Sequence, residues 1–329
     1  MKNVAVLGAD GLIGRELVSI LEQRNFPTEE VYFLAGNDKR TDKIIYKDKQ
    51  IDLLSDYSTF RDKVELVFCC LDKVRARALV PKFKKRALVI DCSGAFSFAH
   101  DVLHVIPEVN GDSVGEHKGV IANPNPITIQ LLTALYPLHK KHALKHLRFT
   151  ALAAVSCFGN DALDELEYEY EFLALDMAVE KTEDSVFPYT IGDNVIPQVG
   201  DFMEKGSTEE ETILAKEIPD ILGQNDIGVS ATCVWVPVKR GNSIALSVDF
   251  VEAVSAAEAK KILKNASGVI LASHDEEYPT LENAVGKDEV FVGRIRQDIT
   301  AQNGLAMWIV ADNLRKGSAL NAVQIAELV

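Results

Sequence analysis

The first third of the chain alternates short apolar segments with amphipathic ones, and this alternation restricts the fold more than any other feature. A strand is expected from Val4 to Gly8, a helix from Gly11 to Arg24, and a second strand from Val31 to Ala35. Later segments of the same kinds predict a helix over 73–85 and strands over 66–70, 88–91 and 119–122. Such an order forms a parallel sheet covered by helices on both faces. We therefore predict a doubly wound α/β domain.

The second half of the chain follows a different pattern. Its apolar residues alternate along longer segments, which predict strands over residues 147–156, 228–237, 243–252 and 289–296 with helices between them. A chain of 329 residues also exceeds the usual size of a single core. We expect one domain from residues 1–126 with 311–329, and an α+β domain with a mixed or antiparallel sheet from residues 127–310.

The charge and the apolar content of the chain limit its partners. With 35 Lys and Arg residues against 49 Asp and Glu residues, the net charge is -14, which would repel nucleic acid and anionic membranes. No apolar stretch approaches the roughly 18 residues that span a bilayer, and the first residues do not resemble a secretory signal. A cytoplasmic protein with small-molecule or protein partners is expected.

The cysteine and histidine residues show no metal-binding pattern. The five cysteines are an odd number and include the neighbours Cys69 and Cys70, so reduced thiols are expected rather than a disulfide framework. The histidines lack the spacing of a zinc motif and are expected to be surface or structural residues: His100, His104, His117, His139, His142, His146 and His274. No metal is predicted. The acidic run from Asp164 to Glu171 is expected to be a solvated helix face.

A glycine-rich loop connects the first predicted strand to the first predicted helix. It includes five residues whose backbone would approach the pyrophosphate of NAD or NADP in a Rossmann-like domain: Gly8, Gly11, Leu12, Ile13 and Gly14. Asp38, just past the second strand, would accept from the ribose 2′-hydroxyl of NAD and reject a 2′-phosphate. Asp10 opposes this prediction, because its carboxylate would repel a phosphate. The alternative is that the glycines only allow the helix to pack against the strand.

Several longer motifs resemble those of bacterial aspartate-β-semialdehyde dehydrogenases over nearly the whole chain. The motifs lie at residues 8–14, 22–27, 107–110, 117–130, 154–156, 194–198, 230–233, 236–238, 292–296 and 312–328. The resemblance implies reduction of an aspartyl phosphate with NADPH through a thioester, in the route to lysine, threonine and methionine. It also implies a homodimer formed through the sheet of the second domain and a terminal helix that returns to the first.

The positions that would carry this chemistry depart from the family pattern. The nucleophilic cysteine corresponds to Pro126, the acid/base histidine to Asn242, and the arginine that grips the substrate carboxylate to Trp235. Proline has no nucleophilic group, and an amide does not titrate near neutral pH. Asn125 and Pro126 would instead serve as the N-cap and the first residue of a helix. The comparison with the family therefore predicts that the helix start is kept while its nucleophile is lost.

Other matched positions show the same trend. Ile213 stands where the family has the lysine of the acyl-phosphate side, three residues after a retained Glu210. Ser97 replaces the phosphate-binding arginine, and Ala153 replaces a glutamine. Leu71-Asp72 replaces a Gly-Gly turn near the nicotinamide. These changes would remove positive charge from the pocket, and the larger side chains of Leu71-Asp72 would fill space that the glycines leave open.

Three functions are compatible with this pattern. The first is a degenerate, divergent member without the catalytic cysteine, which would act as a dimeric binding protein for a nucleotide, a small acidic metabolite or a protein. The second is an active phosphorylating dehydrogenase with a relocated thiol, either Cys157 or Cys92. The third is an oxidoreductase that transfers hydride without covalent catalysis. The simultaneous loss of nucleophile, base and anion clamp favours the first.

Overall fold

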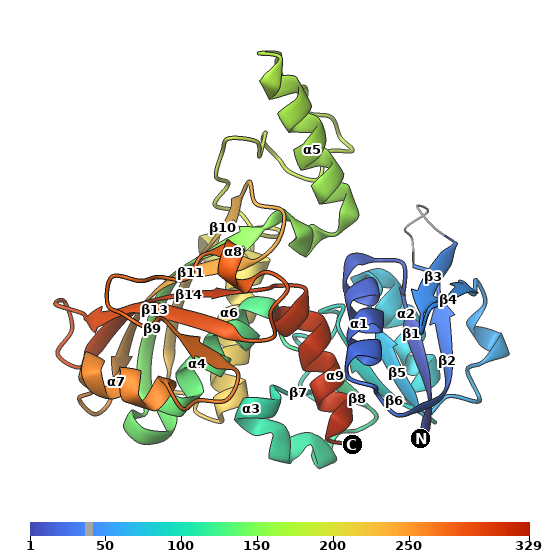
Figure 1. Cartoon of the computed structure of the whole chain (residues 1–329), viewed down its shortest axis with the longest axis horizontal. Helices are drawn as coiled ribbons and strands as arrows, with labels where there is room; N and C mark the ends of the chain where they lie inside the picture. The colour runs from blue at the N-terminus through green and yellow to red at the C-terminus, as the bar shows by residue number, and fades with distance from the viewer. Residues whose placement is uncertain (37–41) are drawn as a thin grey trace. The chain divides into compact units, whose positions relative to one another are not determined.

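The computed structural model describes residues 1–36 and 42–329, so Asp38 lies outside the described residues. The chain forms two compact units (Figure 1). The first consists of Met1–Ile129 with Gly317–Val329, and the second of Gln130–Lys316. The terminal helix thus belongs to the first unit.

The first unit is built on a six-stranded parallel sheet with the order β2-β1-β5-β6-β8-β7. Its strands are β1 (Lys2–Leu7), β2 (Thr28–Leu34), β5 (Leu66–Cys69), β6 (Leu88–Asp91), β7 (Leu103–His104) and β8 (Val120–Ala122). All residues of β5 and β8 are buried, as expected for strands covered on both faces. The prediction of a Rossmann-like parallel sheet is confirmed.

Helices cover both faces of this sheet. On one face, α1 (Leu12–Gln23) and α9 (Leu320–Glu327) pack against a shared apolar cluster. On the other face, α2 (Lys73–Phe83) buries Ala76, Val80 and Phe83 in a second cluster. The first unit also contains elements beyond the predicted ones: the hairpin of β3 (Lys43–Tyr46) and β4 (Lys49–Asp52), and the short α3 (Pro107–Asn110).

The second unit contains a six-stranded mixed sheet with the order β10-β9-β11-β14-β13-β12. Its strands are β9 (Leu144–Ala154), β10 (Gly228–Val236), β11 (Asn242–Phe250), β12 (Val269–Leu271), β13 (Val290–Gln297) and β14 (Gly304–Ala311). The pairs β10·β9 and β12·β13 are parallel, and the other neighbours are antiparallel. This confirms the predicted mixed sheet, although β12 and β14 were not among the expected strands.

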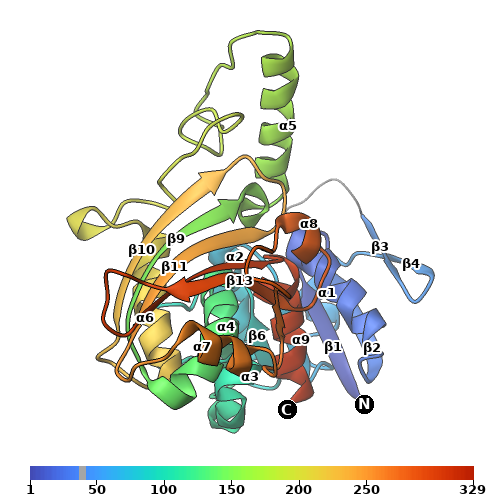
Figure 2. The ribbon, with the colours of Figure 1, turned by 60° about the vertical axis from the view of Figure 1, so that its left-hand side comes forward.

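The two faces of this second sheet differ. Helices α4 (Pro126–His142), α6 (Glu209–Leu222) and α7 (Ala256–Leu263) lie along one face (Figure 2). Burial alternates along β11 from Ile244 to Phe250. The even-numbered residues are buried, and the more exposed residues between them are Ala245, Ser247 and Asp249. The opposite face carries polar and aromatic residues that no helix of the described chain covers: Thr150, Ser230, Thr232, Ser247, Arg294, Arg296 and Trp308. A smaller helix, α8 (Leu281–Ala284), precedes β13.

The helix α5 (Asn160–Ala174) extends away from the sheet of the second unit (Figures 1 and 2). The expected solvated acidic face is wrong for two of its residues. Glu169 is fully buried and accepts hydrogen bonds from the backbone N–H groups of Ile191 and Gly192, at 2.7 and 2.6 Å. Glu165 accepts from Lys181 and from the following loop. These carboxylates tie the returning loop to the helix, because a buried charge must be paired to be stable.

Candidate functional site

The helix α4 begins at the position predicted for the nucleophile. The side-chain Oδ1 of Asn125 accepts the N–H of Ile127 at 2.8 Å, which caps the first turn. Pro126 is the first helical residue, where its missing N–H has no intrahelical partner to lose. The predicted N-cap and N1 pair is therefore confirmed. Both residues belong to the first unit.

In the second unit, Asn242 starts β11 and is fully buried. Its Oδ1 accepts the backbone N–H of Ala154 at 3.1 Å, so the amide ties the end of β9 to the start of β11. The Nδ2 atom has no hydrogen-bond partner within the described part of the chain. An amide held in this way can orient a neighbouring polar group, but it does not exchange a proton near neutral pH.

Cys157 lies beside this amide. Its Sγ is 3.8 Å from Oδ1 of Asn242 and 3.4 Å from Nδ2 of Asn313. Asn313 also binds the Ser156 hydroxyl at 3.0 Å and accepts the N–H of Gly241 at 2.7 Å. The residue as a whole is exposed to solvent. Even so, protein packed around the sulfur and the negative charge of Glu210 raise the pKa of Cys157 to about 12. The thiol is therefore protonated at neutral pH.

The other thiols with shifted pKa values are also held in the neutral form. Burial raises the pKa of Cys69 and of Cys233, with added contributions from nearby carboxylates. A hydrogen bond with Cys70, together with burial, raises the pKa of Cys92. A reactive thiol needs a lowered pKa, and these environments act in the opposite direction.

Trp235 occupies the end of β10 in an aromatic cluster. Its ring meets Phe158 and Phe187 edge-on, with centroid separations of 5.1 and 5.6 Å. Its backbone pairs with Ile196, and in the sheet it stands opposite Ala153. Trp235, Phe187 and Ala153 are almost completely buried. The position matched to a carboxylate-binding arginine is thus filled by ring packing.

The helix α6 carries the two remaining matched positions of the second unit. Ile213 is buried, consistent with its apolar side chain. Glu210 lies in the first turn, and its charge contributes to the raised pKa values of Cys157 and Cys233. The structure therefore brings Glu210 near the two thiols, which the sequence pattern did not indicate.

In the first unit, Ser97 is buried in the loop after β6. A Cβ built on Gly94 would lie 3.7 Å from Cε of Lys73 and 3.8 Å from Oγ of Ser97, so these two side chains border the same glycine. The aliphatic end of the Lys73 side chain and the Ser97 hydroxyl therefore face the same position in this loop. Lys73 was missed because it belongs to α2, far from Ser97 in the sequence.

The glycines of the glycine-rich loop have two roles: Gly8 and Gly14 allow close packing, and Gly11 faces open space. Gly8 has φ +80°, and a Cβ there would lie 2.5 Å from the carbonyl oxygen of Cys70. A Cβ on Gly14 would lie 2.1 Å from the Gly8 oxygen, so both glycines are needed for close packing. At Gly11 the nearest atom to a Cβ is 3.5 Å away, and no side chain caps the start of α1. The uncapped N–H groups at Leu12 and Ile13 therefore fit a phosphate group.

Asp10 is turned toward the end of β2. Its buried Oδ1 accepts the backbone N–H of Gly36, and Oδ2 has no hydrogen-bond partner among the described residues. The backbone of the loop thus fits a dinucleotide pyrophosphate, while the buried Asp10 carboxylate adds a negative charge to the loop.

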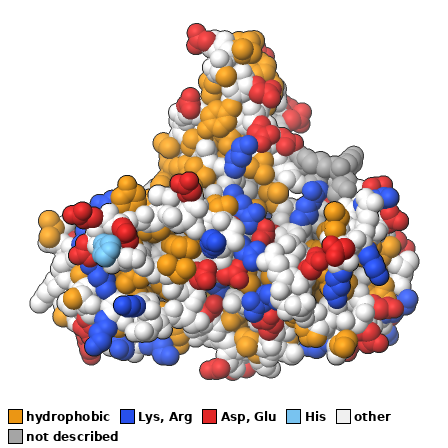
Figure 3. All heavy atoms as spheres, in the orientation of Figure 1, with side chains coloured by type: hydrophobic (Ala, Val, Ile, Leu, Met, Phe, Trp, Pro, Cys, Tyr) orange, Lys and Arg blue, Asp and Glu red, His pale blue; other side chains and the backbone are white. Residues whose placement is uncertain are grey.

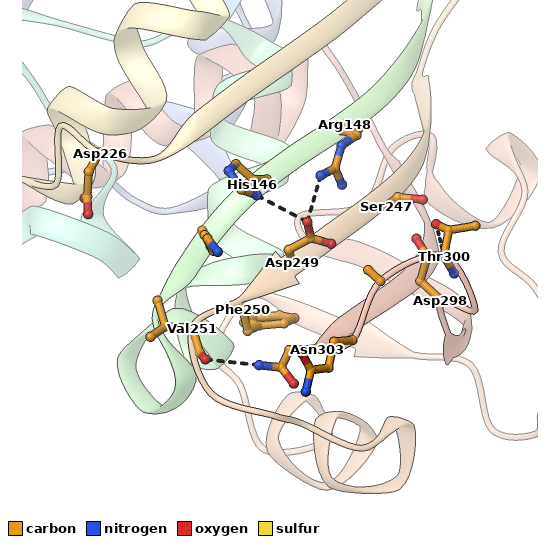
Figure 4. A pocket seen from close by; sticks show the side chains of 13 residues that line it. His146, Arg148, Asp226, Ser247, Asp249, Phe250, Val251, Asp298, Thr300 and Asn303 are labelled. Carbon is orange, nitrogen blue, oxygen red and sulfur yellow. Dashed lines mark hydrogen bonds and ion pairs between the residues drawn. The ribbon is translucent and has the colours of Figure 1, made fainter.

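A separate hollow of about 740 Å³ lies at the start of β9 and the end of β11 (Figure 4). His146 and Arg148 both point to Asp249, at 3.3 and 2.7 Å (Figure 4). The hydrogen bond from Arg148 is the largest cause that lowers the pKa of Asp249. The described residues among the predicted site positions do not line this hollow. Of the predicted positions in the second unit, Trp235 stands opposite Ala153 and Asn242 binds Ala154, at the other end of β9.

The described residues offer neither a metal site nor a membrane span. They contain no group of three or more His, Cys, Asp or Glu side chains placed to hold a metal ion. They also contain no helix that is long and apolar enough to cross a membrane.

Comparisons with known proteins agree with this architecture. Residues 3–117 match the family model for the semialdehyde dehydrogenase NAD-binding domain, and residues 135–316 match the semialdehyde dehydrogenase dimerisation domain. The aspartate-semialdehyde dehydrogenase of Aquifex aeolicus is 38% identical over 99% of this chain and 97% of its own length. That of Bacillus subtilis is 36% identical over 99% of this chain and 96% of its own length.

A solved structure shows the same likeness. Aspartate semialdehyde dehydrogenase II from Vibrio cholerae, crystallised in complex with ASA, has a TM-score of 0.94 and 33% identity, and the match covers 100% of this chain and 98% of that one. The family's NAD-binding domain corresponds to the unit with the parallel sheet, and its dimerisation domain to the unit with the mixed sheet. The chain belongs to the aspartate-semialdehyde dehydrogenase family.

Proposed function

We propose that this chain is a catalytically degenerate member of its family that acts as a dimeric binding protein. The observation that carries the proposal is the state of Cys157, the thiol beside Asn242, whose pKa is raised to about 12. Thioester chemistry requires a thiolate. At neutral pH a thiol with so high a pKa is almost wholly protonated. Pro126, at the matched nucleophile position, has no group that can replace it.

The acid/base position supports the same proposal. The Oδ1 of Asn242 is bonded to the backbone of Ala154, and the side chain is fully buried. A general base must accept a proton at the operating pH, which an amide does not do. The substrate-anchoring position supports it too, because Trp235 is packed against Phe158 and Phe187 and offers no cationic fork for a carboxylate.

The proposed ligand is NAD or NADP, bound at the start of α1. The open position at Gly11 and the uncapped first turn support this, together with the family's NAD-binding domain. A second anionic group, such as a small acidic metabolite, would bind by the loop that Ser97 and the Lys73 side chain border.

The proposed assembly is a homodimer formed through the second unit. One face of its sheet is not covered by helices of the described chain, and it carries arginine, hydroxyl and tryptophan side chains. Hydrophobic side chains also gather on the protruding α5 segment (Figure 3), where Tyr168 and Leu175 are exposed. A second copy would cover such surfaces, as the family's dimerisation domain suggests.

A second candidate function is an active phosphorylating dehydrogenase that uses Cys157. The contacts of its sulfur with Asn242 and Asn313 favour this candidate, since they place a thiol in a polar setting. The raised pKa opposes it, and no histidine of the described chain is hydrogen-bonded to this thiol.

One experiment separates the two functions. The dialysed full-length protein is titrated calorimetrically with NAD and with NADP, and it is then assayed for phosphate-dependent oxidation of aspartate semialdehyde. We expect heat from dinucleotide binding and no turnover, in the wild type and in Cys157→Ser alike. An active member of the family serves as the positive control. Turnover in the wild type that disappears in Cys157→Ser would establish the second function and refute the first.

A further inference from the structure

Two cysteines stand side by side at one edge of the parallel sheet in the first unit. Cys69 ends β5 and pairs in register with Asp91, which ends β6. The next residues along the two strands are Cys70 and Cys92, so the register places them opposite each other. The backbone N–H of Cys70 donates to Leu7, and that of Cys92 donates to the carbonyl of Cys69, both at 2.8 Å. The two strands therefore remain paired at this point.

The two thiols share one face of the sheet. Side chains alternate between faces along a strand, and both Cys70 and Cys92 pack against the apolar cluster that α1 and α9 cover. Cys69 belongs to the cluster on the opposite face. Neighbouring strands lie about 4.8 Å apart, which is within the Cα separation of about 4.4–6.8 Å that a disulfide requires.

The Cys70 thiol is close enough to Cys92 to shift its pKa. A side-chain hydrogen bond joins Cys70 and Cys92 and is the largest cause of the raised pKa of Cys92. Cys92 therefore keeps its proton at neutral pH. Both residues are half-buried and so partly accessible, while Cys69 is completely buried. Their places on adjacent strands and on one face of the sheet select this pair among the cysteines.

We propose that Cys70 and Cys92 form a reversible disulfide when the protein reacts with a small-molecule disulfide such as oxidised glutathione. The Cys70 thiolate attacks one sulfur of oxidised glutathione, and one glutathione thiolate leaves. Cys92 then loses its proton to solvent and attacks the Cys70 sulfur, which releases the second glutathione. Two protein thiols are oxidised to one disulfide, and one molecule of oxidised glutathione is reduced to two of glutathione. Excess reduced glutathione reverses both steps.

This site is in contact with the glycine-rich loop. The carbonyl oxygen of Cys70 lies so close to Gly8 that a Cβ there would be 2.5 Å away, and the Cys70 N–H donates to Leu7 just before the loop. A shift of the Cys70 backbone upon oxidation must therefore move Gly8. We expect oxidation to weaken dinucleotide binding about tenfold. This second consequence rests on the proposed dinucleotide site, whereas the disulfide itself does not.

The disulfide is tested by peptide mapping of the full-length protein. The reduced wild type is incubated with oxidised glutathione, quenched in acid, alkylated and digested, and the Cys70 and Cys92 peptides are identified by mass spectrometry. We expect a linked Cys70–Cys92 peptide in the wild type and in the matched control Cys157→Ser. We expect none in Cys70→Ser, and a glutathione adduct at Cys70 in Cys92→Ser. Circular dichroism confirms that each variant is folded.

The possible results are distinct. The proposal is overturned if Cys70 and Cys92 both stay alkylatable while another cysteine is glutathionylated, or if the Cys92→Ser protein carries no adduct at Cys70. Titration of the oxidised and reduced wild type with NAD then tests the link to the loop. Equal affinities refute the coupling. The absence of binding in both states refutes the proposed dinucleotide site and leaves the mapped disulfide standing.

Discussion

The indole ring of Trp235 meets the ring of Phe158 edge-on, with 5.1 Å between the two centroids and 75° between the ring planes. Edge-to-face packing of this kind adds to the stability that burial alone provides. Phe158 lies in the segment after β9, and Trp235 lies at the end of β10, so the contact joins two parts of the second unit. The position matched to an arginine is therefore occupied by a buried indole ring in an aromatic cluster.

Replacement of Trp235 by arginine is expected to destabilise the protein by about 3–5 kcal/mol, because it would bury an unpaired charge. Trp235→Phe keeps an aromatic ring and should cost only about 1 kcal/mol. Urea unfolding of both variants measures the difference. A Trp235→Arg protein as stable as Trp235→Phe would show that this site still accommodates a cation, contrary to the packing described above.

Replacement of Asn242 by alanine is expected to lower the free energy of unfolding by about 1–3 kcal/mol, because it leaves the buried N–H of Ala154 without an acceptor. The control is Glu276→Ala, at an exposed position of the same unit, which should change stability little. Denaturant titration compares the two. Equal stabilities would mean that the hydrogen bond from Ala154 contributes nothing measurable to this strand junction.

As the pH rises from about 4 to about 6, the free energy of unfolding of the wild type is expected to decrease relative to that of Asp91→Asn. Burial raises the pKa of Asp91 from 3.8 to about 6, against the opposing effect of hydrogen bonds from Ser93. In this window the folded state holds a proton that the unfolded state has released, so stability decreases as pH rises. The variant lacks this titration. Parallel unfolding curves for the two proteins across the range would contradict the raised pKa.

Replacement of Glu169 by alanine is expected to release the loop that returns from α5. The change removes the acceptor for the N–H groups of Ile191 and Gly192 and leaves Lys181 without one of its two carboxylates. We expect a loss of about 1–3 kcal/mol and faster hydrogen exchange at Ile191 and Gly192. Glu171→Ala, at an exposed position on the same helix, is the control and should leave exchange unchanged. Unaltered protection in Glu169→Ala would refute this role.

Replacement of Gly11 by alanine is expected to preserve stability and to weaken NAD binding at least about tenfold. Its φ of -73° suits any residue, and a Cβ would meet no atom nearer than 3.5 Å, so the fold tolerates the methyl group. A bound pyrophosphate needs that open space. In contrast, Gly14→Ala should be unstable because of the 2.1 Å approach to Gly8. If Gly11→Ala bound NAD as tightly as the wild type, the dinucleotide would have to bind elsewhere.

Much of the first unit could be predicted from local patterns. Strands of a parallel sheet are buried on both faces and therefore form continuous apolar runs, such as Leu88–Asp91, which matches β6 residue for residue. The start of α4 was equally clear, because Asn125 and Pro126 have local preferences that suit a helix N-terminus. In both cases the signal depends on neighbours in the sequence.

Features that depend on distant residues were not predicted. The run around Glu169 suggests a solvated helix, but the loop at Ile191 supplies the donors that allow the carboxylate to be buried. The strand β14 was missed since it is almost wholly buried and shows no alternation between its faces. Lys73 and Ser97 are brought to the same glycine only by the packing of α2 beside the loop after β6.

The sequence by itself determined the two layered units and the residue types at positions 126, 235 and 242, because apolar periodicity and local motifs are properties of neighbouring residues. Only the tertiary structure decided what surrounds those residues: an aromatic cluster at Trp235, a backbone hydrogen bond at Asn242, and a protonated thiol at Cys157. Strand register and burial set these contacts and pKa values, and both arise from segments that are distant in the chain.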